Sequence, residues 1–194
     1  ITNLSSGKTG TLLASELISA GAKVTLVYGP GSQVPTKGIK VINVTTSKEM
    51  FDAVKKELQK KYDIIIMAAA ASDYTPQNPS KSKIKSDKKS LVIRLKKTPK
   101  IIDIVKKYQK NTLLVGFKAE TNLSKNALIK SAKIKIKETG ADMIIANDIG
   151  GKYQKNTNYN QIIVVDNKKS ITSGWKKKEK IVKIIKNEIE KKLE

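Results

Sequence analysis

The hydrophobic residues of this 194-residue chain alternate between helical spacing and short continuous runs. Residues 8–20 carry leucine and isoleucine at helical spacing, and Gly21 ends that pattern. Helical spacing recurs at residues 46–58, 99–108 and 124–139. Short apolar runs, which are typical of buried strands, lie at residues 23–28, 41–44, 63–70, 113–117 and 143–146. This order predicts an α/β fold, a Rossmann-like, mostly parallel sheet with helices on both faces.

Three local signals mark the expected ends of these helices. Thr46 and Glu49 form a capping-box pattern. Pro99 is expected in the first turn of its helix, where its missing N–H costs nothing. Gly140 is expected to end the helix over residues 124–139.

Residues 72–90 interrupt the alternation, because they are polar, rich in lysine and serine, and contain two prolines. We expect a lysine-rich loop or flap there. Leu91 to Leu95 alternates apolar with polar or basic residues and predicts a half-exposed strand.

The end of the chain predicts a hairpin and a helix. The apolar run at 162–165 and a short piece near Ile171 indicate the hairpin, with Asp166 and Asn167 in its turn. Residues 176–193 predict an amphipathic helix. We expect one domain over residues 1–194, and the start at Ile1 suggests either a domain excised from a longer chain or one that lacks its lead-in strand.

Composition narrows the chemistry, because the chain contains neither cysteine nor histidine. Disulfides, thiolate catalysis, histidine-based triads and the usual neutral-pH base are excluded. Any catalysis must use lysine, carboxylates, amides, hydroxyls or backbone groups. No apolar run approaches the roughly 20 residues of a membrane helix, and the first residues are not typical of a signal peptide. We therefore expect a cytoplasmic protein.

The formal net charge of +22 raises the alternative of a nucleic-acid-binding protein. Aromatic residues make up only 5% of the chain, with one tryptophan and two phenylalanines, which is poor for base stacking. The basic residues are nearly all lysine, whereas proteins that read DNA grooves favour arginine. An anionic small substrate needs only a local basic patch.

The opening stretch ITNLSSGKTG has the composition of a phosphate-binding turn. Gly7 and Gly10 would let backbone approach a ligand, Ser5 and Ser6 add hydroxyls, and the next helix offers free N–H groups to an anion. The stretch is neither a P-loop nor a GxGxxG motif, so Lys8 is not read as a P-loop lysine. The alternative is an ordinary glycine-containing turn with serine caps.

Two further segments follow the predicted strand at 63–70. In AAAASDY the alanines leave space for a ring or sugar, and Asp73 can accept from a ribose hydroxyl or help position a metal ion. Tight packing with Asp73 as a cap is the alternative. The lysines at 81, 83 and 85 lie on the predicted flap, where one can close over a triphosphate or simply face solvent.

The last two candidate segments are GFKAET and IIAND. Phe117 can pack on a base or belong to the core, and Glu120 can cap the chain that follows. Asn147 and Asp148 follow a buried strand, as ligand contacts or as turn formers.

Taken in order, ITNxSSGKxG, AAAxSDY, KIK, TPxI, GFKAET and AND resemble the phosphopantothenate–cysteine ligase family over almost the whole chain. In bacteria and archaea that unit is usually the C-terminal half of a bifunctional coenzyme A biosynthesis protein, whose N-terminal half is an FMN-dependent decarboxylase. The resemblance implies that CTP activates 4′-phosphopantothenate as an acyl-cytidylate with release of pyrophosphate. The amine of L-cysteine then displaces CMP. Mg²⁺ would be carried by the triphosphate without dedicated protein ligands, and members form homodimers.

The resemblance also implies roles for individual residues. Asn3 would contact phosphopantothenate and the intermediate's carbonyl, Lys83 would serve activation, and Asn147 would bind substrate. The other nucleotide-binding positions implied are Ser6, Gly7, Gly10, Ala68, Ala69, Ala70, Asp73, Pro99, Lys100, Ile101, Ile102, Phe117 and Lys135.

The chain departs from the family pattern in three places. Lys100 replaces an aspartate, Thr139 replaces the second lysine of a KxxxK pair that Lys135 begins, and Asn158-Tyr159 replaces Gly-Phe. These departures bear on substrate affinity more than on the reaction. Either Lys133 or Lys137 compensates for the lost cation, or the affinity for phosphate is lower.

The sequence also bears on subunit pairing and on the alternative of a reductase. The strand at 91–95 is the candidate for pairing between subunits of a homodimer. The alternative of an NAD(P)-binding reductase predicts an acidic residue at the end of the second strand, where Tyr28-Gly29-Pro30 stands instead.

Overall fold

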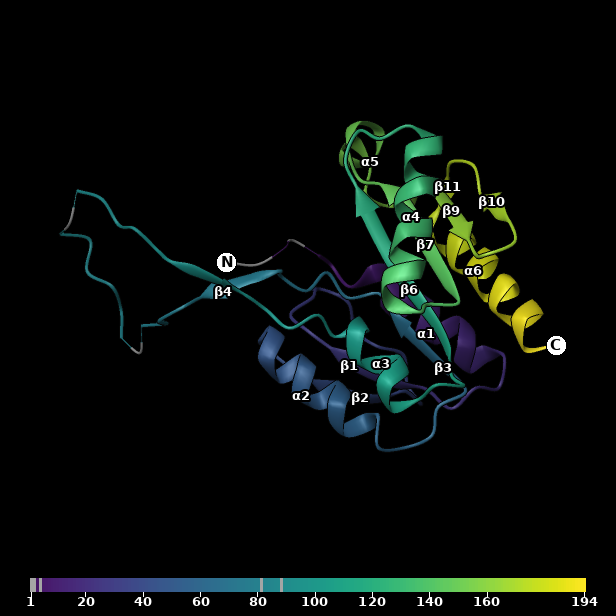
Figure 1. Ribbon diagram of the computed structural model, residues 1–194, viewed down its shortest axis with the longest axis horizontal. Coiled ribbons are helices and arrows are strands. Elements are labelled where there is room, and N and C mark those ends of the chain that lie inside the picture. The colour runs from purple at the N-terminus through teal and green to yellow at the C-terminus, as the bar shows by residue number, and fades with distance from the viewer. Residues whose placement is uncertain (1–2, 4, 81, 88) are drawn as a thin grey trace.

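A five-stranded sheet lies at the centre of the computed structural model, which describes residues 3, 5–80, 82–87 and 89–194 (Figure 1). The strand order is β10-β9-β7-β6-β3. Strands β3, β6 and β7 are parallel, whereas β9 runs antiparallel to β7, and β10 to β9. The bounds are β3 Ile64–Met67, β6 Leu113–Glu120, β7 Met143–Asp148, β9 Ile162–Val165 and β10 Ser170–Thr172.

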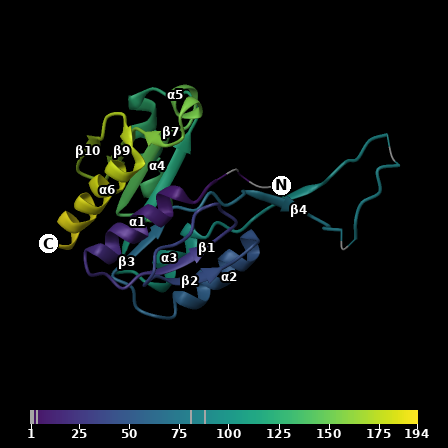
Figure 2. The same cartoon turned by 180° about the vertical axis from the view of Figure 1, so that it is seen from behind.

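Helices cover both faces of this sheet, as the sequence predicts. Alternate strand residues such as Leu114 and Val115 enter two separate cores, because side chains of a strand point to opposite faces. One core joins the sheet to α2 (Ser47–Glu57), α3 (Ile102–Tyr108) and α4 (Lys125–Thr139). The other joins it to α1 (Lys8–Ser19) and α6 (Lys178–Leu193). Figure 1 shows α4 in front of the sheet, and Figure 2 shows α1 and α6 in front. None of the described helices has the length and apolar character that a membrane crossing requires.

A separate parallel pair, β1 (Thr25–Tyr28) and β2 (Lys40–Asn43), lies beyond β3. Within the described residues, β1 pairs with β2 only and β3 pairs with β6 only. All residues of β1 and β3 line one cavity of about 1980 Å³, and all are half-buried. In the doubly wound strand order 3-2-1-4-5-6, β2, β1 and β3 match positions 3, 2 and 4. Position 1 of that order lies between positions 2 and 4. The apolar part of the cavity, between β1 and β3, therefore corresponds to position 1.

The expected strand at 91–95 is wrong in its position. The strand is β5 (Leu95–Lys97), which pairs antiparallel with β4 (Tyr74–Pro76) inside the segment expected to be a loop. The apolar alternation of LVIRL suggested a half-buried strand, yet Val92 is 86% exposed. Pairing begins instead at the base of the flap, where Thr98 is anchored: its N–H donates to the Asp73 carbonyl at 2.9 Å and its hydroxyl to the Ser72 carbonyl at 2.6 Å.

The start of α3 also differs from the expectation. The helix begins at Ile102, so Pro99 lies before it and not in its first turn. The first backbone bonds run from the Asp103 N–H to the Lys100 carbonyl and from the Ile104 N–H to the Ile101 carbonyl, both at 3.2 Å, so a tighter turn with three-residue spacing precedes the helix.

The capping signals of α2 and α4 are confirmed. Thr46 accepts from the Glu49 N–H at 3.1 Å, and Gly140 ends α4 with a left-handed φ of 68°. The Glu49 carboxylate, however, accepts from the N–H of Thr45 at 2.8 Å, one residue earlier than a capping box requires. Asp166 forms the predicted hairpin turn by accepting from two backbone N–H groups at 2.7 Å.

Three short elements at the end of the chain were not predicted. They are α5 (Gly151–Lys155), β8 (Tyr159–Asn160) and β11 (Lys176–Lys177), and β8 pairs with β11. Each is too short for a hydrophobic period to be visible. Because β11 occupies residues 176 and 177, the terminal helix begins two residues later than expected.

The buried carboxylate of Glu57 is the basis of a stability prediction. Its oxygens lie 2.7 and 2.8 Å from the Lys60 ammonium, and it accepts from the Tyr62 hydroxyl. These hydrogen bonds lower the pKa of Glu57 from 4.5 to about 2. A carboxyl whose folded pKa is depressed stabilises the fold above its unfolded pKa, and that contribution is lost as the pH falls from 4.5 towards 2.

We expect Glu57→Gln to lower the free energy of unfolding by about 1–3 kcal/mol at pH 7. The difference from wild type should shrink between pH 4.5 and pH 2, as urea unfolding at a series of pH values would show. The exposed pair of Lys48 with Asp52 provides the control, since Asp52→Asn should change the value by less than about 0.5 kcal/mol. Equal stability of wild type and Glu57→Gln at pH 7 would contradict the prediction.

Candidate functional site

The first turn of α1 presents free backbone N–H groups to the cavity. Gly7 precedes the helix with a left-handed φ of 75°. The Ser5 hydroxyl accepts from the Gly7 N–H, and the Ser6 hydroxyl from the Lys8 N–H, both at 3.3 Å. Among described atoms, the amides of Thr9 and Gly10 have no acceptor. Such a helix end suits an anion, because its free N–H groups and helix dipole are both positive.

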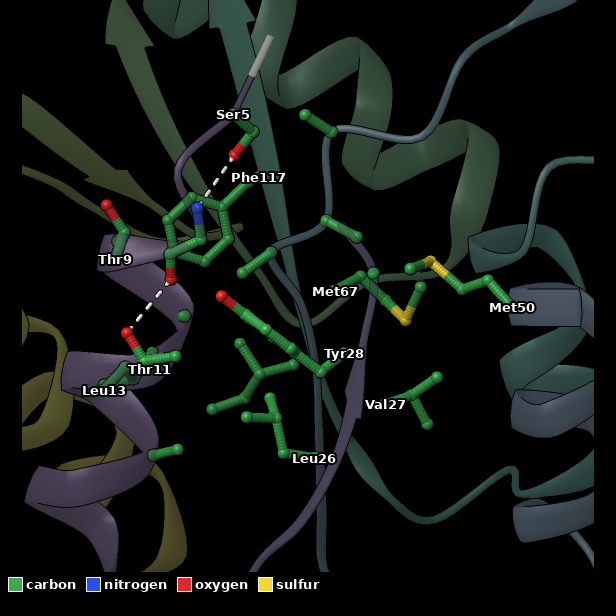
Figure 3. Close-up of a pocket in the computed structure, with 18 of the residues that line it drawn as sticks. Ser5, Thr9, Thr11, Leu13, Leu26, Val27, Tyr28, Met50, Met67 and Phe117 are labelled. Carbon is green, nitrogen blue, oxygen red and sulfur yellow. Dashed lines mark hydrogen bonds between the residues drawn. The ribbon is translucent and has the colours of Figure 1, made fainter. Parts of the chain in front are cut away.

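Tyr28 defines the space around this turn, and sequence analysis missed it. A Cβ built on Gly7 would lie 2.9 Å from Cε2 of Tyr28, whereas one on Gly10 would meet no atom within 4 Å. The Tyr28 hydroxyl donates to the Gln33 carbonyl at 2.8 Å and accepts from the Gln33 N–H at 3.1 Å. Figure 3 shows Tyr28 reaching from β1 towards α1. Gly7 is therefore needed both for its backbone angle and for its lack of a side chain.

The alanine segment after β3 meets the opening stretch. The Asn3 side-chain amide donates to the Ala71 carbonyl at 3.2 Å, across 68 positions of sequence. Ala68 is half-buried, and Ala69 and Ala70 are exposed. These alanines, Asn3 and Asp73 all line the cavity. The structure thus places the first two predicted segments side by side.

Phe117 and Asn147 reach the same cavity from β6 and β7. Ala119 stands opposite Asn147 in the parallel register, two residues beyond Phe117. Asn147 is only 8% exposed. Figure 3 shows Phe117 beside the first turn of α1, close to Ser5.

Asp148 and Glu120 have structural partners. Asp148 accepts from the N–H groups of Asn122 and Gly150 at 2.9 and 2.8 Å, which supports the turn-forming interpretation. Glu120 accepts from the Ser131 hydroxyl at 2.8 Å and pairs with Lys118 at 3.0 Å. The Ser131 hydrogen bond and then Lys118 lower the pKa of Glu120.

The cavity therefore gathers most of the predicted site residues at the carboxyl ends of the parallel strands. Those that line it are Asn3, Ser6, Gly7, Gly10, Ala68, Ala69, Ala70, Asp73, Phe117 and Asn147. Those that do not line it are Lys83, Pro99, Lys100, Ile101, Ile102 and Lys135. The roles of all of them stay predictions.

The residues outside the cavity lie in three places. Lys83 is exposed on the flap, which extends away from the body in Figures 1 and 2. Ile101 is buried, and the Cδ1 atom of Ile102 would lie 2.9 Å from a Cβ on Gly116, so both pack in the core. The ammonium of Lys135 lies 3.5 Å from Glu138 on α4.

Thr139 serves the end of α4. Its hydroxyl donates to the Lys135 carbonyl at 2.7 Å and accepts from the Ala141 N–H at 3.3 Å, and the residue is buried. A lysine at this position would need to leave that arrangement. Thr139, which stands where the family pattern has a lysine, therefore forms hydrogen bonds at the end of α4.

Lysines near the first turn of α1 complete the site. Lys8 lies 3.0 Å from the Asn158 side-chain oxygen and 3.1 Å from the Glu179 carboxylate, which agrees with the expectation that it is not a P-loop lysine. Lys178 and Tyr153 also line the cavity. No motif in the sequence singled out these two residues. Over the described residues, no group of three or more carboxylate, histidine or cysteine side chains is placed to hold a metal ion.

The family model for the DNA/pantothenate metabolism flavoprotein C-terminal domain matches residues 1–193. The chain belongs to this family. The Coenzyme A biosynthesis bifunctional protein CoaBC of Thermococcus kodakarensis is 47% identical to this chain over 150 residues, which are 77% of this chain and 37% of that protein. The chain spans 37–47% of the length of the curated relatives compared.

Solved structures share the fold of this chain. A DNA/pantothenate metabolism flavoprotein from Streptococcus pneumoniae has a TM-score of 0.84 at 28% identity and covers 98% of this chain and 90% of its own. The C-terminal domain of a coenzyme A biosynthesis bifunctional protein CoaBC has a TM-score of 0.80 at 29% identity, with coverage of 100% and 86%.

The two glycines of the opening stretch give a matched test of the site's geometry. Gly7→Ala should lower the free energy of unfolding by about 1–3 kcal/mol, because of its left-handed φ and the contact with Tyr28. Gly10→Ala lies within α1 in open space and should raise stability by about 0.5–1 kcal/mol. Urea unfolding of both variants measures this. Similar effects at the two positions would refute the described first turn.

Proposed function

We propose that this chain catalyses CTP-driven amide formation between 4′-phosphopantothenate and L-cysteine, giving phosphopantothenoylcysteine for coenzyme A biosynthesis. The observation that carries the proposal is the convergence of the opening stretch with the segment after β3, joined by Asn3 and Ala71 at 3.2 Å. Family membership and relatives named for coenzyme A biosynthesis support it. A Cab2 mutant in complex with phosphopantothenate-cysteine shares the fold, with a TM-score of 0.69 at 17% identity.

The reaction suits a protein without histidine or cysteine. A substrate carboxylate oxygen attacks the α-phosphorus of CTP, and pyrophosphate leaves. The cysteine amine then attacks the acyl carbonyl, loses a proton, and CMP leaves with the C–O bond electrons. The nucleophile in each step belongs to a substrate, so the protein supplies positioning and charge stabilisation.

The triphosphate would lie at the first turn of α1. The amides of Thr9 and Gly10 and the hydroxyls of Ser5 and Ser6 fit phosphate oxygens in chemistry. Mg²⁺ would arrive with the triphosphate and neutralise part of its charge. Gly10 leaves room for the ligand, since no atom lies within 4 Å of a Cβ built there.

The nucleoside would lie along the segment after β3. Ala68, Ala69 and Ala70 expose backbone to it, and Asp73 would accept from a ribose hydroxyl. Phe117 would contact the base from β6, with Pro99, Lys100 and Lys135 at the outer edge, while Ile101 and Ile102 stay in the core. Because the residues at the outer edge do not line the cavity, their contacts require closure of the site around the nucleotide.

Asn3 and Lys83 would act on different steps. The Asn3 amide is a neutral donor beside Ala71 and would polarise the acyl carbonyl for attack by the amine. Lys83 lies on the flap, whose base is anchored by Thr98, and would close over the triphosphate to neutralise charge that develops on the phosphates.

Separate assays of the two steps test these roles. With phosphopantothenate, CTP and Mg²⁺, wild type should release pyrophosphate, and added cysteine should yield CMP and the amide. Asn3→Asp should still release pyrophosphate but slow amide formation by about 10²-fold. Lys83→Gln should slow pyrophosphate release by about 10²-fold, whereas the flap control Lys85→Gln should stay near wild type.

The same assay also decides the proposal as a whole. No pyrophosphate from wild type with CTP or any other nucleoside triphosphate would overturn the ligase function. Normal activation by Lys83→Gln would overturn only the role of that lysine. Equal rates with ATP and CTP would overturn the nucleotide preference.

We also propose that the chain forms a homodimer through the flap. Exposed apolar side chains gather on it: Ile84 is 52% exposed, Leu91 53%, Val92 86% and Ile93 50%. A contiguous apolar surface of this kind is typical of an interface. Pairing of two flaps would also cover the backbone edges of the β4–β5 hairpin.

The dimer proposal predicts a mass change for one flap variant. Val92→Glu should shift the protein from dimer to monomer, because a carboxylate would be buried in the interface. Val34 is 91% exposed and outside the flap, so Val34→Glu should leave the dimer intact. Light scattering after size exclusion measures both. A wild-type monomer, or a dimer unaffected by Val92→Glu, would contradict it.

A further inference from the structure

Lys178 is a buried lysine at the start of α6. The residue is 5% exposed and lines the cavity. Its N–H donates to the Asn158 carbonyl at 2.9 Å, which fixes the backbone of the helix start. Its ammonium donates to the Tyr153 hydroxyl at 3.1 Å and lies 5.2 Å from the centre of that ring. Asn158 thus holds the backbone of Lys178 and Tyr153 holds its side chain, at the wall of the cavity.

The ammonium of Lys178 has no carboxylate partner within 4.0 Å among the described residues. The adjacent Glu179 pairs with Lys8 at 3.1 Å, so the nearest acid along the chain is already engaged. A buried charge that is not paired costs several kcal/mol. Tyr153 supplies only a neutral oxygen and a ring, which compensate part of that cost.

The cavity that Lys178 lines is also lined by a buried amide side chain. Asn147 is 92% buried, since 8% of it is exposed, and it lines the same cavity with no hydrogen-bond partner for its side chain among the described residues. The start of α6 adds its helix dipole. The first turn of α1 lies nearby, because Lys8 bonds to the Asn158 side chain while Lys178 bonds to the Asn158 backbone.

We propose that Lys178 binds a phosphate group of a substrate, assisted by Tyr153 and Asn147. The Tyr153 hydroxyl accepts from the ammonium and retains its own proton to donate to a phosphate oxygen. The Asn147 amide supplies a further donor. A lysine ammonium is a compact point charge that recognises phosphate. The identification of the phosphate rests on the proposed ligase function, which offers two sources: the terminal phosphates of the triphosphate and the phosphate of phosphopantothenate.

Binding measurements on a matched pair of variants test this inference. Lys178→Met removes the buried charge, and Lys180→Met removes an exposed charge from the same helix. Pyrophosphate, as a probe for the triphosphate end, and 4′-phosphopantothenate are titrated calorimetrically into each protein. Lys178→Met should weaken binding of one of the two by at least about 10-fold, while Lys180→Met should change it less than about 3-fold.

The ligand whose affinity falls identifies the source of the phosphate. Unchanged affinity of Lys178→Met for both ligands would overturn the inference. If that variant does not fold, wild-type crystals with each ligand decide instead: a phosphate oxygen about 3 Å from the Lys178 ammonium supports the assignment, and phosphates elsewhere in both crystals overturn it. Wild-type turnover is measured in parallel. Phosphate binding at Lys178 without turnover would refute the ligase function and leave this inference standing.

Discussion

The parallel pairing of β3, β6 and β7 is the constraint on which the site depends. Met67 is opposite Gly116, and Glu120 is opposite Asp148, so the three strands leave the sheet on the same side. Every segment that follows them must then cross one edge of the molecule. Phe117 and Asn147 occupy that edge directly, and the chain after Met67 delivers Asp73 to it. The parallel pairing alone is therefore enough to bring these groups to one edge of the sheet.

The first turn of α1 adds the positive end of a helix to this edge. Its position depends on close contact between Gly7 and Tyr28 and on the bond between Asn3 and Ala71. Lys8 and Lys178 bring further positive charge, but they differ in kind. Lys8 is paired with Glu179, whereas Lys178 is buried against a tyrosine. A site built from backbone amides and lysines suits phosphate chemistry, in which charge neutralisation and orientation provide most of the catalysis.

Local signals predicted the regular elements well. Ser124 and Gly140 bound α4 as expected, because caps act within one turn. The flap was less predictable. Its strands pair between residues 74–76 and 95–97, next to the bonds of Thr98 with residues 72–73, and such contacts between distant residues leave no periodic signal. Likewise, nothing in the spacing of the sequence places Tyr153 beside Lys178. Motif order predicted the residues that line the cavity better than it predicted the outer positions, since Pro99 and Lys135 lie on elements that do not face it.

The central claim is that the strand-end segments form one nucleotide site. Amide chemical-shift changes on titration of the ¹⁵N-labelled chain with CTP and Mg²⁺ test it most directly, because they locate the ligand without assuming turnover. The largest changes are expected at residues 5–10, 68–73 and 117–119, with little change on the outer face of α4 at Lys130 and Ile134. Changes centred on that outer face, or none at saturating CTP, would contradict it.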